Sequence, residues 1–110
     1  MKKDNSIFVG HILESIKNIE EYIGSANFSN FETNKMMNRA VIRELEIIGE
    51  ASNRLDEDFR KQHSELPWRE IKAFRNKVLH EYFGVRLIVV WDTLQEDLPV
   101  LKKALQQASE

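Results

Sequence analysis

The chain contains the stretch Ala40-Val41-Ile42-Arg43-Glu44-Leu45-Glu46-Ile47-Ile48-Gly49-Glu50-Ala51, in which apolar and charged residues alternate at helical spacing. Residues three and four positions apart share one face of an α-helix. The pattern extends in both directions and predicts one amphipathic helix that buries Met37, Val41, Leu45, Ile48, Leu55 and Phe59. Gly49 lies inside this helix, where glycine costs roughly 1 kcal/mol relative to alanine. Close approach of another helix is the expected reason for it.

A second pattern of the same period lies on the N-terminal side. Apolar residues recur from Phe8 to Ile23 and stop at Gly24, a residue type that commonly ends helices. Residues 25–30 are polar and small, which predicts a loop.

Two more patterns lie on the C-terminal side. One helix is expected to open near Pro67 and close at Gly84, and the next carries apolar residues from Leu87 to Leu105. Pro99 interrupts the last pattern, either as a kink or as the first residue of a short fifth helix. The prediction is therefore an all-α, antiparallel four- to five-helix bundle.

Composition limits the possible classes of protein. A chain of 110 residues with 42% apolar and 31% charged residues suits one soluble domain over residues 1–110. The absence of cysteine excludes disulfides and thiolate metal sites. Neither a signal peptide nor an apolar run of about 18 residues is recognisable, so we expect a cytoplasmic protein without a membrane span.

Charge is distributed unevenly along the chain. The formal net charge is −2, which argues against a general nucleic-acid binder. Six basic and two acidic residues nevertheless give residues 60–77 a local net charge of +4. Such a segment suits a confined phosphate site, although a solvated surface with uneven charge would look the same.

The stretch Arg75-Asn76-Lys77-Val78-Leu79-His80-Glu81-Tyr82 lies at the end of this basic segment. Histidine titrates near neutral pH, and the planar fork of arginine fits phosphate oxygens. On a regular helix Arg75 and His80 lie roughly 140° apart around the axis. A local distortion, the reach of the arginine or a second copy of the chain across a two-fold axis could bring them together.

Several other residues have a structural and a functional interpretation. His11 and Glu14 have helical spacing but reverse the order used in diiron bundles, which favours a structural role. His63 has no partner in sequence and is expected to be solvated. Arg43 and Glu50 share a helix face, where they would form a charge pair or line a groove. Trp68 and Trp91 fall on apolar stripes and are expected in the core.

The order R-N-x-x-x-H-x-Y at residues 75–82 resembles the signature of the HEPN superfamily, and specifically of its HepT-like branch. The stretch at residues 40–51 resembles the second-helix block of that family. Pro67-Trp68-Arg69-Glu70-Ile71 and Val90-Trp91-Asp92-Thr93-Leu94 resemble two further blocks, so the similarity covers essentially the whole chain.

The resemblance implies a HEPN-like symmetric homodimer that acts as the toxin of a type VII HEPN/MNT toxin–antitoxin system. It implies a metal-independent endoribonuclease that needs no cofactor and cuts messenger or transfer RNA. Arg75 and His80 would be catalytic and Asn76 would position the substrate, while Arg43, Glu50, Lys72 and Lys77 are candidates for lining the groove. Tyr82 would accept AMP from an MntA-like nucleotidyltransferase antitoxin.

A rival interpretation comes from a different functional class. Some helical relatives of this family serve as non-catalytic, substrate-binding partners of a nucleotidyltransferase. The presence of Arg75, Asn76, His80 and Tyr82 together favours the nuclease, because a scaffold does not require that set.

Overall fold

The computed structural model of the chain describes residues 3–66, 68, 69, 71 and 86–108. In that part of the chain every regular element is an α-helix, which confirms the predicted all-α class. The helices are α1 (Lys3–Ile23), α2 (Phe28–Thr33), α3 (Lys35–Arg54), α4 (Glu57–Gln62) and α6 (Leu87–Ala108). None of these described helices has the length and hydrophobicity required to cross a membrane.

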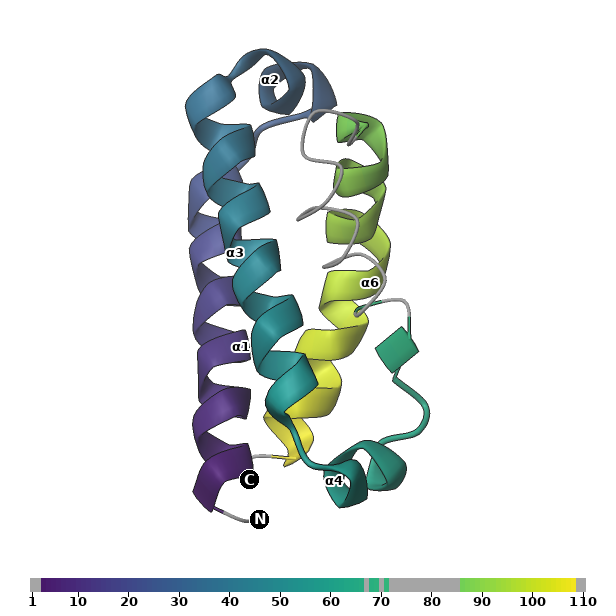
Figure 1. Cartoon of the computed structure of the whole chain (residues 1–110). Coiled ribbons are helices and arrows are strands. Elements are labelled where there is room, and N and C mark those ends of the chain that lie inside the picture. Colours follow the sequence, from purple (N-terminus) through teal and green to yellow (C-terminus); the bar gives the residue numbers. More distant parts are fainter. Residues whose placement is uncertain (1–2, 67, 70, 72–85, 109–110) are drawn as a thin grey trace.

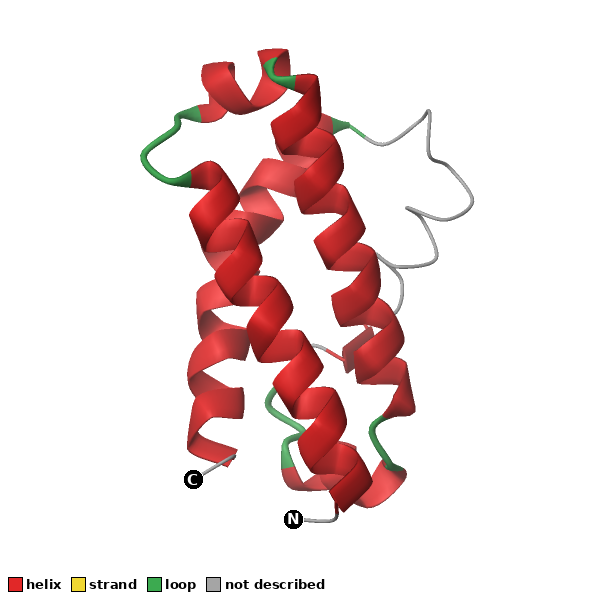
Figure 2. Cartoon of the chain, turned by 90° about the vertical axis from the view of Figure 1, so that its left-hand side faces the viewer, coloured by secondary structure: helices red, strands yellow, loops and turns green. Residues whose placement is uncertain are grey.

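Three long helices form the body of the bundle. Helices α1 and α3 lie side by side and antiparallel, and α6 packs beside them (Figure 1). Short helices close the two ends, with α2 next to the start of α3 and α4 next to its end (Figure 2). The core between the helices is made of buried aliphatic side chains and two phenylalanines: Val9, Ile12, Ile16, Ile19, Phe31, Val41, Ile42, Leu45, Ile48, Ala51, Leu55, Phe59, Leu66, Val90, Leu94, Leu98, Leu101 and Leu105.

The N-terminal helix ends where the sequence predicts. Gly24 has a φ of 53°, a left-handed conformation that disfavours residues with a side chain. Its N–H donates to the Glu20 carbonyl at 2.9 Å, which completes the last turn of α1.

The expected loop at residues 25–30 is only partly correct, because the short helix α2 begins at Phe28. Asn27 and Asn30 form a reciprocal capping box, with side-chain oxygens that accept from each other's backbone N–H at 2.9 and 3.1 Å. The polar residues that suggested a loop therefore initiate a helix. Phe31 follows on this helix and is fully buried.

The single helix predicted from Met37 to Phe59 is wrong in its continuity. Helix α3 ends at Arg54, Leu55 has an extended ψ of 139°, and α4 starts after Asp56. Asp56 caps α4 by accepting from the Phe59 N–H at 2.8 Å. Leu55 and Phe59 are both buried, so the apolar pattern identified the core residues correctly across the break.

The C-terminal pattern forms one uninterrupted helix, so Pro99 does not start a fifth helix. Pro99 and Gln95 are both exposed, so water can solvate the Gln95 carbonyl that proline leaves without an amide donor. Of the helix expected from Pro67 to Gly84, Trp68, Arg69 and Ile71 are helical, and the remainder lies outside the described residues.

Candidate functional site

The residues that the sequence singles out for catalysis lie outside the described part of the chain. These are Arg75, Asn76, His80 and Tyr82, together with the groove candidates Lys72 and Lys77. How Arg75 and His80 come together, within one chain or across two copies of it, therefore stays at the level of the sequence-based prediction.

Arg43 and Glu50 are the groove candidates that the structure describes. Arg43 donates to Glu46 Oε2 at 3.0 Å, one helical turn away, rather than to Glu50. The expected Arg43–Glu50 pair is thus replaced by an i, i+3 pair. Arg43 and Glu50 are both exposed on α3. Their role in lining a groove stays a prediction.

A buried carboxylate joins α1 to α3. Glu44 is 9% exposed, and its oxygens accept from the Tyr22 hydroxyl at 3.4 Å and from Asn18 Nδ2 at 3.5 Å. Desolvation, followed by the charge of Glu44, its hydrogen bond and the charge of Glu21, raises the pKa of Tyr22 above 10.0. Tyr22 is therefore a neutral donor at physiological pH, and the cluster has a structural role.

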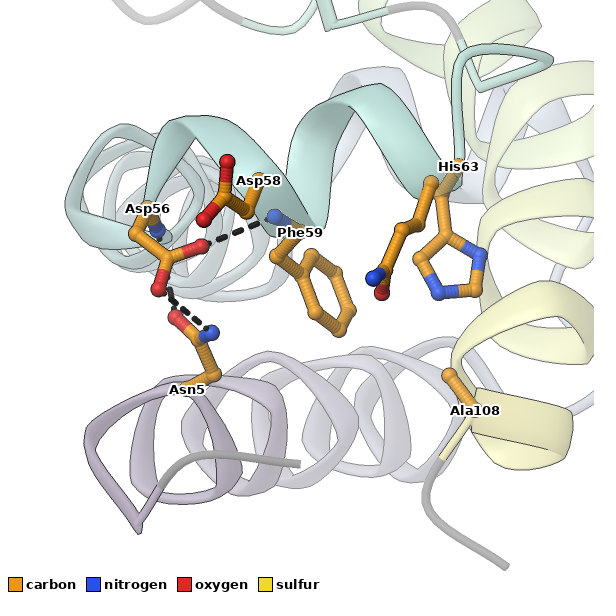
Figure 3. Close-up of a pocket in the computed structure, with 7 residues that line it drawn as sticks. Asn5, Asp56, Asp58, Phe59, His63 and Ala108 are labelled. Carbon is orange, nitrogen blue, oxygen red and sulfur yellow. Dashed lines mark hydrogen bonds between the residues drawn. The ribbon is translucent and has the colours of Figure 1, made fainter.

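A cavity of about 580 Å³ lies between α4 and the ends of α1 and α6, and we call it the acidic cavity. It is lined by Asn5, Asp56, Asp58, Phe59, Gln62, His63 and Ala108. Asn5 Nδ2 donates to Asp56 Oδ2 at 3.0 Å, and the Asp56 N–H donates back to Asn5 Oδ1 at 3.1 Å (Figure 3). The polar side chains of Asn5 and Asp56 are thus already hydrogen-bonded to each other's residues.

The expectation that His63 is solvated is wrong. Its side chain is 22% exposed, and its ring lies 4.6 Å from that of Phe59, one helical turn earlier. Its Nδ1 lies 3.6 Å from Glu65 Oε1. His63 ends α4, so its ring folds back over Phe59 on the same helix face.

His11, the other histidine that the structure describes, and the two tryptophans are closer to expectation. The exposed His11 ring lies edge-on to the Phe8 ring, with 6.2 Å between the ring centroids, as suits a structural role. Among the described residues, no group of three or more His, Asp or Glu side chains is arranged to hold a metal. Trp91 packs on Phe31, with 5.3 Å between the ring centroids. Trp68 packs against the core through Phe59, with 6.3 Å between the ring centroids.

A second cavity, of about 260 Å³, lies where the end of α3 meets α4 and the helical residues Trp68 and Arg69. We call it the arginine cavity, and it is lined by Gly49, Ser52, Asn53, Arg60, Trp68 and Arg69. Arg60 lies two residues from both Asp58 and Gln62, or roughly 200° around the axis of α4. The two cavities therefore use different faces of the same short helix.

Sequence reasoning counted Arg60 and Arg69 only as part of a local positive charge, and it missed Ser52 and Asn53. The available signal was weak, because a serine and an asparagine on a helix have no pattern of their own. They join the arginines only because the chain breaks at Leu55 and α4 turns away from the axis of α3.

Comparisons with known proteins agree with the resemblance in the sequence. The family described as Ribonuclease HepT-like matches residues 12–108. "Probable ribonuclease HepT" from Thermococcus cleftensis is 45% identical over 102 residues, which are 93% of this chain and 93% of the relative. "Putative RNase MJ1380" from Methanocaldococcus jannaschii is 41% identical over 105 residues, 96% of each chain.

No solved structure gives a significant match to the chain. The family assignment therefore depends on sequence, and the all-helical bundle is compatible with it. Because the match spans most of the chain, this protein belongs to the HepT-like family of the HEPN superfamily.

Proposed function

We propose that this protein is a metal-independent endoribonuclease and the toxin of a HEPN/MNT toxin–antitoxin system. The observation that carries the proposal is that Arg75, His80 and Tyr82 occur in the family order within a chain that matches the family over residues 12–108. The names of the two relatives, which describe them as a ribonuclease and an RNase, support RNA as the substrate.

The proposed reaction is cleavage by attack of a ribose 2′-oxygen on the adjacent phosphorus. His80 takes the proton of the 2′-hydroxyl or gives one to the leaving 5′-oxygen. The P–O5′ bond breaks, so the products are a 2′,3′-cyclic phosphate and a 5′-hydroxyl. Arg75 stabilises the charge that grows on the phosphate oxygens, and Asn76 orients the substrate or the imidazole.

A symmetric homodimer would place two copies of the motif around one groove, with one histidine accepting and the other donating a proton. Arg43, Glu50, Lys72 and Lys77 are the candidates for lining that groove. Ultracentrifugation at the protein concentration of the cleavage assay tests this step. A monomer that retains full activity would exclude the shared groove.

Tyr82 is the proposed site of control by a nucleotidyltransferase antitoxin. Transfer of AMP to its hydroxyl adds bulk and negative charge beside a phosphate-binding site, which opposes RNA binding. Tyr82→Phe should remain toxic in cells that express the antitoxin, and normal growth of those cells would contradict covalent control.

The direct test uses the purified chain with total RNA in EDTA. We expect cleavage that leaves 2′,3′-cyclic phosphate ends and is lost in His80→Ala and Arg75→Ala. Intact RNA, with Tyr82 shown by mass spectrometry to be unmodified, would instead favour the non-catalytic partner of a nucleotidyltransferase.

A further inference from the structure

The arginine cavity contains a polar group that has no partner. Ser52 is 4% exposed, and its hydroxyl is the one buried side-chain polar atom among the described residues without a hydrogen bond. A buried hydroxyl left in this state costs about 1–3 kcal/mol, and buried polar atoms in proteins are nearly always paired. Ser52 is one of the residues that line the cavity, but its hydroxyl is closed off from solvent, so a rotation about χ1 has to turn the hydroxyl toward a ligand before the ligand can supply the missing partner.

The charge of the cavity specifies the kind of ligand. Arg60 and Arg69 both line it, and no carboxylate does among the described residues. Within that part of the chain neither arginine forms an ion pair, whereas Arg43 pairs with Glu46 and Arg54 lies over the Phe8 ring. Two arginines without an acidic partner suit an anion that accepts several hydrogen bonds, and phosphate fits this description best.

The wall opposite α3 is rigid and partly apolar. The Trp68 indole N–H donates to the His63 carbonyl at 2.9 Å, and its ring contacts Phe59 at 6.3 Å. Because the indole N–H is already hydrogen-bonded and the ring packs against Phe59, the indole presents a fixed surface to the cavity. Such a surface suits a sugar or a base and loses little entropy when a ligand binds.

The size of the cavity limits what can enter. Its volume of about 260 Å³ is below the range of about 300–1,000 Å³ that is usual for drug-sized ligands. It therefore suits one phosphate with its ribose, which is a repeating unit of a nucleic-acid strand.

We propose that the arginine cavity binds a phosphate–ribose unit of the RNA substrate, outside the linkage that is cut. Arg60 and Arg69 bind the phosphate, and the Ser52 hydroxyl bonds the ribose 2′-hydroxyl, which both donates and accepts. This role rests on the proposed ribonuclease function, because it takes the bound strand to be the RNA that the motif at residues 75–82 cuts.

The test measures binding separately from cleavage. In the full chain carrying His80→Ala, the affinity for a fluorescent single-stranded RNA and for the same sequence as DNA is measured by anisotropy over a range of KCl concentrations. Arg60→Gln and Arg69→Gln should each weaken RNA binding about tenfold. Each should also reduce the slope of log K against log salt by about 0.7.

The controls separate this site from general charge and from folding. Arg39→Gln removes the same charge from the exposed surface of α3 and should change affinity less than twofold. Ser52→Ala should weaken RNA binding about threefold to tenfold and leave DNA binding unchanged. Arg60→Lys keeps the positive charge but not the planar guanidinium that can bind two phosphate oxygens. It should therefore retain the slope of log K against log salt and lose part of the affinity for RNA.

The outcomes distinguish the two proposals. If the unmodified chain cuts RNA and the cavity variants bind RNA like the parent, the cavity is not a subsite while the ribonuclease stands. If the variants lose RNA binding and the unmodified chain does not cut RNA, the cavity is an RNA-binding site but not a substrate subsite, and the ribonuclease falls. Binding of AMP alone as tightly as RNA, through the same residues, would overturn the assignment to a strand of RNA.

Discussion

The acidic cavity and the arginine cavity both adjoin α4 and treat their polar groups in opposite ways. In the acidic cavity Asn5 and Asp56 exchange two hydrogen bonds, and Asp56 also caps the helix. In the arginine cavity the Ser52 hydroxyl has no partner, and no carboxylate among the described residues lines the wall. The larger cavity is therefore the less suitable one for a ligand.

The two cavities indicate that the hydrogen-bond pairing of polar groups, rather than the volume of the cavity, separates a structural cluster from a binding site. A polar group that the fold already satisfies gains little from a ligand, because it must first give up its present bond. A group that the fold leaves unsatisfied gains the full hydrogen bond. The following experiments ask whether the two cavities divide stability and RNA binding in this way.

The largest effect is expected from Asn5→Ala in the acidic cavity. The change removes a 5% exposed side chain and both of its bonds to Asp56, which should lower the free energy of unfolding by about 1–3 kcal/mol. Denaturant unfolding followed by circular dichroism measures it. Gln62→Ala is the matched control, since Gln62 lines the same cavity but is exposed, and it should change stability by less than about 0.5 kcal/mol. Equal losses in the two variants would contradict the structural role of the Asn5–Asp56 pair.

A reciprocal exchange of amide and carboxylate comes next. Asn53→Asp places a negative charge at the arginine cavity with almost no change in shape, so it should weaken RNA binding about fivefold through repulsion of phosphate. Asp58→Asn removes a charge from the acidic cavity and should leave RNA affinity within twofold. Both affinities are measured at a temperature where circular dichroism shows the variants folded. A larger change in RNA affinity with Asp58→Asn than with any arginine-cavity variant would place the RNA on the other face of α4.

Ser52→Ala is expected to change stability less than Asn5→Ala, and to stabilise the protein rather than destabilise it. Removing a buried hydroxyl that has no partner should leave the free energy of unfolding unchanged or raise it by up to about 1 kcal/mol. Asn38→Ala serves for contrast on the same helix, because Asn38 is buried and donates to the Phe31 carbonyl at 3.2 Å. Ser52→Ala that destabilises the chain as much as Asn38→Ala would mean that the hydroxyl has a partner within the folded protein.

The same distinction explains which features were predictable from the sequence. Periodicity identified the buried face of the long helices α1, α3 and α6, because residues on one helix face recur at a fixed spacing, and it correctly placed Leu55 and Phe59 in the core. It could not detect the break between them, since Asp56 acts as a cap only where its side chain meets the Phe59 amide. The motif at residues 75–82 was visible because its residues are close in sequence. The arginine cavity was not, because Ser52, Arg60 and Arg69 come together only after the chain turns.

The smallest expected effect concerns Glu44, a third polar cluster whose groups are already paired. Tyr22 is 41% exposed, and partial desolvation, the charge of Glu44 and the hydrogen bond to Glu44 together raise its pKa. Glu44→Gln should therefore lower the pKa of Tyr22 toward its ordinary value, because the change removes the charge of Glu44 and the hydrogen bond to its carboxylate. The chain has two tyrosines, so ultraviolet titration in a Tyr82→Phe background reports Tyr22 alone.

The sign of the accompanying change in stability follows from linkage. A folded-state pKa above the unfolded one favours the folded state fully below about pH 10, and this contribution is lost as pH rises through the folded pKa. Glu44→Gln should reduce that alkaline loss and, since Glu44 lies in neither cavity, leave RNA affinity unchanged. An unaltered Tyr22 titration would show that Glu44 does not control this tyrosine. A loss of RNA binding would show that satisfied clusters also take part in recognition, which would remove the distinction between the two cavities.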